Sequence, residues 1–198
     1  MVTFLLNGEV VNADVKPSDT LLNYLREVKG LTGTKEGCNE GDCGACSIIV
    51  TDKEGVAKSI NACIALMPQL HGKAIRTVEG ISSSEGELHP IQTAMIKNHG
   101  SQCGYCTPGF ITTLAAAHKN GEKDFEIQLA GNLCRCTGYG PILKSAEEIA
   151  EAAVPNWMQE NLALLKNMNS NIQVPQTITE LANLYAKNPT AKLVAGAT

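Results

Sequence analysis

The sequence predicts an α+β protein in which a small strand-rich unit is followed by a helical one. Short β-prone runs dominate up to about residue 78, whereas from about residue 87 the apolar residues recur at the spacing of a helix. Eight cysteines in 198 residues are gathered into short motifs, and a hydrophobic content of 43% is enough for a packed core. We therefore expect compact domains organised around turns that carry cysteine.

The N-terminal unit is predicted to wrap strands around a single helix. Asn7-Gly8 separates the first two β-prone runs, and this dipeptide adopts the positive φ angles that a tight hairpin turn needs. A helix follows, with Ser18 or Asp19 as its cap, and a glycine-rich loop over residues 30–46 ends it. The five predicted strands span Val2 to Leu6, Glu9 to Val15, Ser47 to Thr51, Val56 to Ile60 and Lys73 to Val78.

The second unit is predicted as a small bundle of four helices. Proline has no N–H to lose in the first turn of a helix, so Pro90, Pro108 and Pro141 each indicate a helix start. Thr107 is placed to cap the second of these helices. A shorter helix, over Glu126 to Ala130, lies between the second and the last.

Residues 154–174 are predicted to be a linker, because prolines bracket a polar stretch rich in Asn and Gln. After it, Thr177 and Glu180 form a capping box for another helix, and a strand is expected to begin at Lys192. One helix and half a strand cannot bury their own apolar faces. We therefore expect residues 175–198 to be the beginning of a further domain that is truncated or separated.

Composition excludes several classes of function. Charged residues are 18% of the chain and the net charge is -4, so we expect neither a basic surface for nucleic acid nor a disordered chain. No apolar run is long enough to span a membrane, and the N-terminus lacks the features of a signal peptide. The expected location is the cytoplasm, where thiols stay reduced and cysteine clusters favour metal binding over disulfides.

The first four cysteines follow the spacing C-x4-C-x2-C, with a fourth after sixteen further residues: Cys38, Cys43, Cys46 and Cys63. This is the spacing of plant-type [2Fe-2S] ferredoxins with a shortened last gap. Glycine has no Cβ, so a glycine-rich loop lets backbone N–H groups approach the anionic sulfur. The glycines in this loop are Gly33, Gly37, Gly41 and Gly44.

The second four form two tight pairs separated by 27 residues: Cys103, Cys106, Cys134 and Cys136. Each pair lies in a turn at a predicted helix boundary, so two facing turns can hold one cluster between them. A C-x-C pair is too tight for an ordinary zinc site but is no obstacle at a [2Fe-2S] centre. Two clusters in one small chain indicate electron transfer.

The cysteines allow two other interpretations. A disulfide framework fits the even count, but the expected compartment argues against it. Structural zinc would accept the C-x2-C elements, whereas C-x4-C and C-x-C do not favour it. Iron-sulfur binding is therefore the prediction at both quartets.

Four segments resemble the iron-sulfur signatures of the molybdenum hydroxylases, the family that includes xanthine dehydrogenase, aldehyde oxidoreductase and carbon monoxide dehydrogenase. These are LTGTKEGC ending at Cys38, GDCGAC ending at Cys46, QCGYCTPG from Gln102 and CRCTGY from Cys134. The likeness covers about residues 1–153. It implies a β-grasp ferredoxin-like domain over residues 1–78 and a four-helix-bundle domain over residues 79–153, each with one [2Fe-2S] cluster.

The resemblance also implies an electron-transfer component of a molybdenum-dependent oxidoreductase. In the family, a molybdopterin centre on another domain or subunit hydroxylates the substrate, and electrons leave through the bundle cluster, then the ferredoxin-like cluster, then FAD. By this analogy, Gln102 would hydrogen-bond the pterin and Cys136 would lie against its amino group. For Gln102 there is a second interpretation, a turn residue that bonds to local backbone.

Residues 175–198 resemble the start of the family's flavoprotein domain, in which Gly196 would approach the FAD pyrophosphate. Iron-sulfur followed by FAD on one chain is the order of xanthine dehydrogenase, so a purine-oxidising enzyme is the prediction. The expected partners are a molybdopterin-binding large subunit and an FAD domain, within a hetero-oligomer. The alternatives are a related aldehyde, carbon monoxide or aromatic-heterocycle dehydrogenase, a free-standing ferredoxin-like carrier, and a zinc-stabilised interaction module.

Overall fold

The computed structural model describes residues 1–168 and 173–193, so Gly196 and most of the strand predicted from Lys192 lie outside the described ranges. The strands are β1 Val2–Leu6, β2 Glu9–Ala13, β3 Ser47–Thr51, β4 Ala57–Asn61 and β5 Ala74–Arg76. The helices are α1 Leu21–Asn23, α2 Pro90–Lys97, α3 Thr107–Asn120, α4 Phe125–Gln128, α5 Gly140–Glu148, α6 Leu162–Asn167 and α7 Ile178–Lys187. None of the helices in these ranges is long and apolar enough to cross a membrane.

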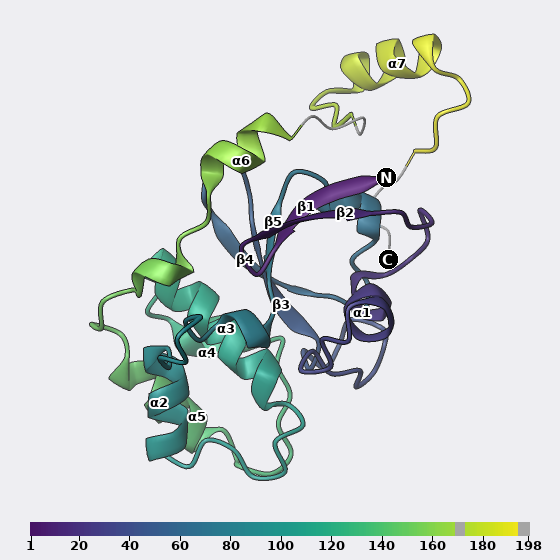
Figure 1. The fold of residues 1–198 in the computed structure, drawn as a ribbon. Helices are drawn as coiled ribbons and strands as arrows, with labels where there is room; N and C mark the ends of the chain where they lie inside the picture. The colour runs from purple at the N-terminus through teal and green to yellow at the C-terminus, as the bar shows by residue number, and fades with distance from the viewer. Residues whose placement is uncertain (169–172, 194–198) are drawn as a thin grey trace.

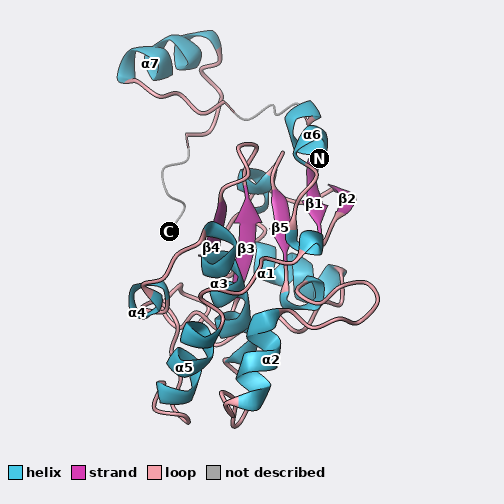
Figure 2. Cartoon of the chain, turned by 90° about the vertical axis from the view of Figure 1, so that its left-hand side faces the viewer, coloured by secondary structure: helices cyan, strands magenta, loops and turns pink. Residues whose placement is uncertain are grey.

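The five strands form one mixed sheet in the order β2-β1-β5-β3-β4 (Figure 2). β1 and β5 run parallel, and the other neighbours are antiparallel. The hairpin between β1 and β2 turns at Asn7 and Gly8, which have φ angles of 51° and 91°, as the sequence predicted. All five residues of β3 are buried, because the sheet is covered on both faces.

Successive side chains of a strand point to opposite faces of the sheet. Figure 1 shows α1 and α3 on opposite sides of it. On one face, Phe4 and Ile48 pack against α1 and the π-helical turn Tyr24–Val28 that continues it. On the other face, Ile49 belongs to the core formed with α3. This arrangement of a mixed sheet with helices confirms the α+β class.

Helices α2, α3, α4 and α5 pack against one another around that second core, and α3 also lies along β3 and β4. The helix starts at Pro90, Pro108 and Pro141 are confirmed to within a residue or two. The caps predicted for α1 and α3 were wrong. Thr107 is the first residue of α3, behind Cys106, and Thr20 rather than Ser18 or Asp19 caps α1.

Residues 154–168, which the sequence assigned to a linker, pack on the body of the molecule. A 3-10 turn over Asn156–Met158 and helix α6 bury Met158 and Leu165 completely. A buried ion pair of 2.9 Å between Arg76 and Glu160 fastens this segment to β5. The stretch is polar overall, but a few buried apolar side chains hold it against the rest of the molecule.

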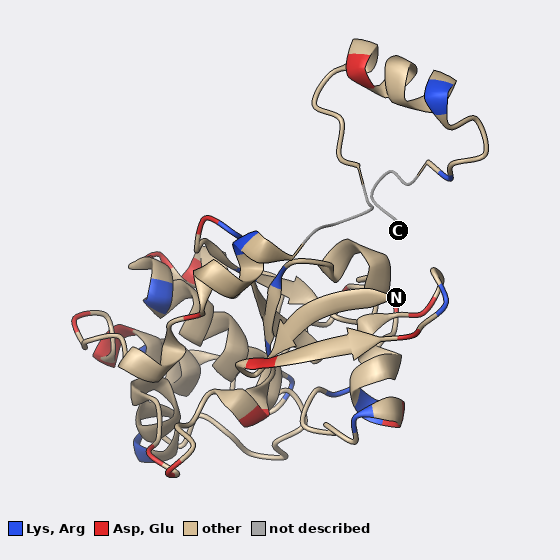
Figure 3. Ribbon diagram, turned by 45° about the horizontal axis from the view of Figure 1, so that its top comes forward, with Lys and Arg blue, Asp and Glu red and all other residues tan. Residues whose placement is uncertain are grey.

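Helix α7 extends away from the body (Figure 1) and buries none of its residues. The Thr177 hydroxyl accepts the N–H of Glu180 at 3.1 Å, which is the predicted cap. Ile178 is 87% exposed, so the apolar side of this helix is uncovered in the chain as described. Basic and acidic residues are interspersed over the ribbon (Figure 3).

Candidate metal centres

The fold brings the eight cysteines to two neighbouring sites. The first site consists of the loop over residues 30–46 together with Cys63, which follows β4. The second consists of the turn before α3 and the turn before α5. The thiols are free, and their exposure differs: Cys46 and Cys63 are buried, Cys38, Cys43, Cys106 and Cys134 are half-buried, and Cys103 and Cys136 are exposed.

The thiols of the first site lie as two interacting pairs, Cys38 with Cys43 and Cys46 with Cys63. Within the described ranges, no three His, Cys, Asp or Glu side chains come as close together as ligands of one metal ion. The two irons of a [2Fe-2S] cluster each take two thiolates. Two pairs of thiols are therefore the arrangement that such a cluster requires.

Backbone N–H groups point at the sulfur of the first pair. The N–H of Glu40 is the main reason that the pKa of Cys38 is lowered to about 7, and the N–H of Cys43 donates to the same sulfur at 3.4 Å. Burial acts in the opposite direction at Cys63, where it raises the pKa to about 12, with Cys46 adding to the effect. A buried thiolate here needs a positive partner, and the irons of a cluster would supply that charge.

Two of the predicted loop glycines are required for different reasons. A Cβ on Gly37 would lie 2.7 Å from the sulfur of Cys43, so glycine is needed beside the thiol as expected. A Cβ on Gly33 would instead lie 2.5 Å from the Val78 side chain and 2.7 Å from the Glu79 carboxylate. Gly33 also donates its N–H to the Glu79 carboxylate at 2.8 Å, which ties the loop to the turn after β5.

The second site is built on helix ends. Cys106 and Cys134 interact directly, and burial raises the pKa of Cys106 to about 12. The N–H of Cys134 donates to the Tyr139 hydroxyl at 2.9 Å, and the Tyr139 ring contacts that of Phe110 at a centroid distance of 6.2 Å. The Thr137 hydroxyl lies 3.1 Å from the Cys134 sulfur. Sequence reasoning did not single out Tyr139 or Thr137, although both belong to the CRCTGY motif.

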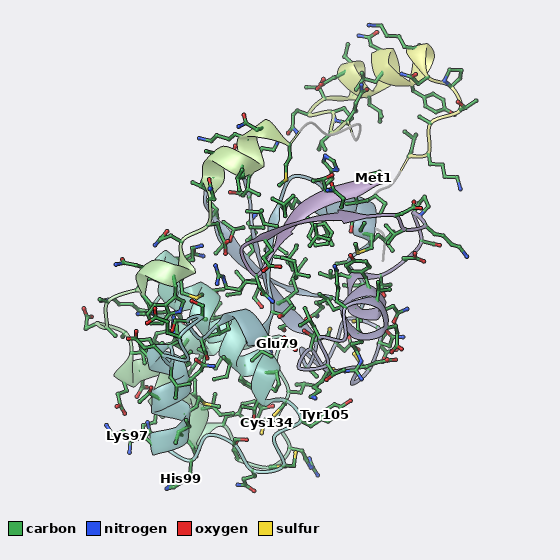
Figure 4. All side chains as sticks on the ribbon, in the orientation of Figure 1. Met1, Glu79, Lys97, His99, Tyr105 and Cys134 are labelled. Carbon is green, nitrogen blue, oxygen red and sulfur yellow. The ribbon has the colours of Figure 1, made fainter. Side chains whose placement is uncertain are left out.

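Direct hydrogen bonds connect the two sites. Leu133 donates its N–H to the carbonyl oxygen of Cys43 at 2.9 Å. The Asn132 side chain donates to the carbonyl oxygen of Gly44 at 3.1 Å. On another side, the Tyr105 hydroxyl bonds to the carbonyl oxygen of Glu36. Figure 4 shows Tyr105 and Cys134, one from each turn of the second site.

Of the other predicted site residues, two lie within the described ranges and one lies outside them. Gln102 and Cys136 are both exposed, on the two turns that hold the second group of thiols. Gly196 lies outside the described residues. Asn132 was not predicted as a site residue. Its side-chain contacts are with residues almost ninety positions away in the sequence, and such contacts leave no local pattern.

Comparison with protein-family models gives two matches. A 2Fe-2S iron-sulfur cluster binding domain matches residues 4–68, and a [2Fe-2S] binding domain matches residues 77–147. Each matched segment contains one of the two cysteine quartets.

Individual relatives agree with the family models. Xanthine dehydrogenase of Calliphora vicina is 46% identical over 151 residues, and xanthine dehydrogenase/oxidase of Gallus gallus is 45% identical over 159 residues. These matches cover 71% and 75% of this chain but only 11% and 12% of the curated relatives. The solved structure of quinoline 2-oxidoreductase from Pseudomonas putida 86 has a chain 37% identical, with a TM-score of 0.68, over 76% of this chain and 93% of that one.

Proposed function

The chain belongs to the molybdenum hydroxylase family, as its iron-sulfur part, and from this premise we propose that it carries electrons between a molybdopterin centre and FAD. The observation that carries the proposal is the arrangement of the eight thiols in two neighbouring sites, connected by a backbone hydrogen bond between Leu133 and Cys43. A [2Fe-2S] cluster, when bound, accepts and releases single electrons. Two such sites in contact within one chain form a short relay.

The roles of the chain's own residues follow from their contacts. We propose that the first cluster is held by Cys38, Cys43, Cys46 and Cys63, and the second by Cys103, Cys106, Cys134 and Cys136. The N–H groups of Glu40 and Cys43 point at sulfur in the first site and would favour its more negative, reduced state. In the second site, the Thr137 hydroxyl lies close enough to the Cys134 sulfur to do the same.

The exposed half of the second site faces the proposed electron donor. Cys103 and Cys136 are exposed, and Gln102 beside them is exposed too. We propose that a molybdopterin-binding domain or subunit covers this surface, with Gln102 and Cys136 against the pterin. The first site is then the exit toward FAD.

The proposed organisation of the chain follows the family. Residues 1–78 would be a β-grasp domain and residues 79–153 a four-helix bundle, with residues 154–174 leading to the start of an FAD domain over residues 175–198. The uncovered apolar side of α7 supports the last assignment, because such a face must pack against further structure. Gly196 would approach the FAD pyrophosphate.

We propose purine oxidation as the reaction of the complete enzyme, since the relatives named above include two xanthine dehydrogenases that match across both iron-sulfur domains. Oxidation of an aromatic heterocycle is the second candidate, favoured by the likeness to quinoline 2-oxidoreductase. Assay of the complete enzyme with xanthine and with quinoline distinguishes the two.

Metal analysis and electron paramagnetic resonance (EPR) test the electron-carrier proposal. The protein isolated without oxygen should contain two irons per site, and reduction with dithionite should give two distinct EPR signals. Cys43→Ser should remove one signal, and Cys106→Ser should remove the other. Zinc in place of iron, or a single signal in the unaltered protein, would refute the proposal.

Copurification separates an enzyme part from a free-standing carrier. The protein should purify together with a larger molybdenum-containing chain or domain. A protein that carries both clusters but purifies alone and reduces several unrelated acceptors would be a ferredoxin-like carrier instead.

A further inference from the structure

The two cysteine sites approach each other backbone against backbone. A Cβ on Gly44 would lie 2.3 Å from the carbonyl oxygen of Gly131, and a Cβ on Gly109 would lie 2.1 Å from the carbonyl oxygen of Gly44. A Cβ is therefore excluded at Gly44 and at Gly109. The 2.9 Å hydrogen bond from Leu133 N–H to the Cys43 carbonyl lies within this contact.

That hydrogen bond joins residues that are part of, or directly next to, the two sites. Cys43 supplies a sulfur to the first site, and Leu133 is bonded covalently to Cys134, which supplies a sulfur to the second. The path between the sulfurs of Cys43 and Cys134 therefore consists of covalent bonds and one short hydrogen bond. Electrons tunnel more readily along bonded atoms than across a van der Waals gap, so this path favours electronic coupling.

A further connection, through Tyr105, is longer. It passes from the turn of the second site through the whole side chain of Tyr105 and then to the carbonyl of Glu36, two residues before Cys38. The connection at Leu133 is therefore the shorter of the two.

The Asn132 side chain fixes the geometry of that shorter connection. Its amide nitrogen donates to the carbonyl oxygen of Gly44 at 3.1 Å and to the Ser47 hydroxyl at 3.3 Å. Its own N–H bonds to the carbonyl of Leu129 at 2.9 Å. Asn132 thus holds the residue after Cys43 on one side and immediately precedes Leu133 on the other.

We propose that the hydrogen bond from Leu133 to Cys43 is the main electronic link between the two cluster sites, and that Asn132 is the positioning residue that maintains it. This inference rests on the proposed electron-transfer function. In the step concerned, one electron leaves a reduced cluster at the second site and enters an oxidised cluster at the first. No proton moves, and no bond forms or breaks.

The test uses Asn132→Asp in the full protein with both clusters. The change keeps the shape of the side chain but replaces the amide donor by an oxygen that repels the Gly44 carbonyl. We expect slower electron exchange between the clusters after pulse radiolysis and a smaller spin-spin splitting in the EPR spectrum of the fully reduced protein. The iron content and the two individual signals should remain.

Asn120→Asp is the matched control. Asn120 also joins the two domains through its side chain, with its amide nitrogen 2.6 Å from the Ala57 carbonyl oxygen, but it lies at the far end of α3 from Cys106. The distance along the helix is about 20 Å. This variant should keep both the exchange rate and the splitting, as should Tyr105→Phe.

A second variant removes the donor itself. Incorporation of the α-hydroxy acid analogue of leucine at position 133 keeps the side chain and replaces the N–H by an oxygen. This analogue should slow electron exchange between the clusters at least as much as Asn132→Asp does. If Asn132→Asp fails to bind iron, the analogue alone tests the inference. An unchanged rate in the analogue, or equal losses in Asn120→Asp, would overturn the inference. Missing iron or a missing signal in the unaltered protein would instead refute the proposed function.

Discussion

The two cysteine sites differ in how completely this chain encloses them. In the first, Cys46 and Cys63 are only 2% and 4% exposed, and the loop of the site wraps the sulfur with its own N–H groups. In the second, Cys103 and Cys136 lie on the outer surface of two turns. The strand-and-loop unit thus encloses its site more completely, whereas the helix ends leave two of their four cysteines exposed.

The largest effect is expected from breaking the contact between the first site, which is closed, and the second site, which is open to the surface. Gly44→Ala combines a left-handed φ of 68° with a Cβ only 2.3 Å from the Gly131 carbonyl oxygen. We expect the free energy of unfolding to fall by about 3 kcal/mol, from backbone strain and overpacking together. Urea unfolding, followed by circular dichroism, measures this loss.

Gly30→Ala is the matched control for strain alone. Gly30 has the same φ of 68°, but a Cβ there meets nothing within 4 Å. Its loss should be about 1 kcal/mol, the cost of the left-handed conformation. Equal losses in the two variants would mean that the backbone contact between the sites contributes nothing to stability.

This contact shows what the sequence could and could not predict. The strands β1 and β3 and the turn at Asn7-Gly8 were predicted to the residue, because alternation and the Asn-Gly dipeptide are local signals, whereas β2 ends at Ala13 and not at Val15. The division of the cysteines into two quartets was likewise readable from spacing. The contacts of Asn132 with Gly44 were not, since they join residues 88 positions apart and depend on how two domains pack.

The errors at helix starts have a related cause. Thr107 has the chemistry of a cap, but Cys106 takes that position and makes no side-chain hydrogen bond to the helix. The hydroxyl of Thr107 bonds to Ser101 instead. Local propensity therefore failed where a binding turn and a helix end share the same residues.

Lowering the pH should destabilise the helical unit before the strand-rich one. The difference in stability between the surroundings of the two sites should therefore increase. His89, which caps α2, is fully buried, and burial, followed by the influence of His118 and Arg76, lowers its pKa to about 4. Between pH 6.5 and 4 the unfolded chain therefore binds a proton here that the folded chain does not, so stability is lost as the pH falls. At pH 5 this loss amounts to roughly 2 kcal/mol.

His89→Asn isolates this contribution, because asparagine is a good helix cap and does not titrate. The variant should be less stable than the unaltered protein at pH 7, owing to the cavity left by the ring. The difference between the free energies of unfolding of the two proteins should be smaller at pH 5 than at pH 7 by roughly 2 kcal/mol, as measured by urea unfolding at both pH values. A gap that stays constant would show that His89 is not the group responsible.

The smallest effect concerns the scaffold of the open site. Tyr139→Phe keeps the ring contact with Phe110 but removes the oxygen that accepts the N–H of Cys134. Loss of one partly buried hydrogen bond should cost about 1 kcal/mol. Because the hydroxyl touches only the second site, a chelator should then release iron from that site faster, while the EPR signal of the first site decays as before. If both signals decayed faster together, the two sites would share one scaffold, and the contrast between a closed and an open centre would be wrong.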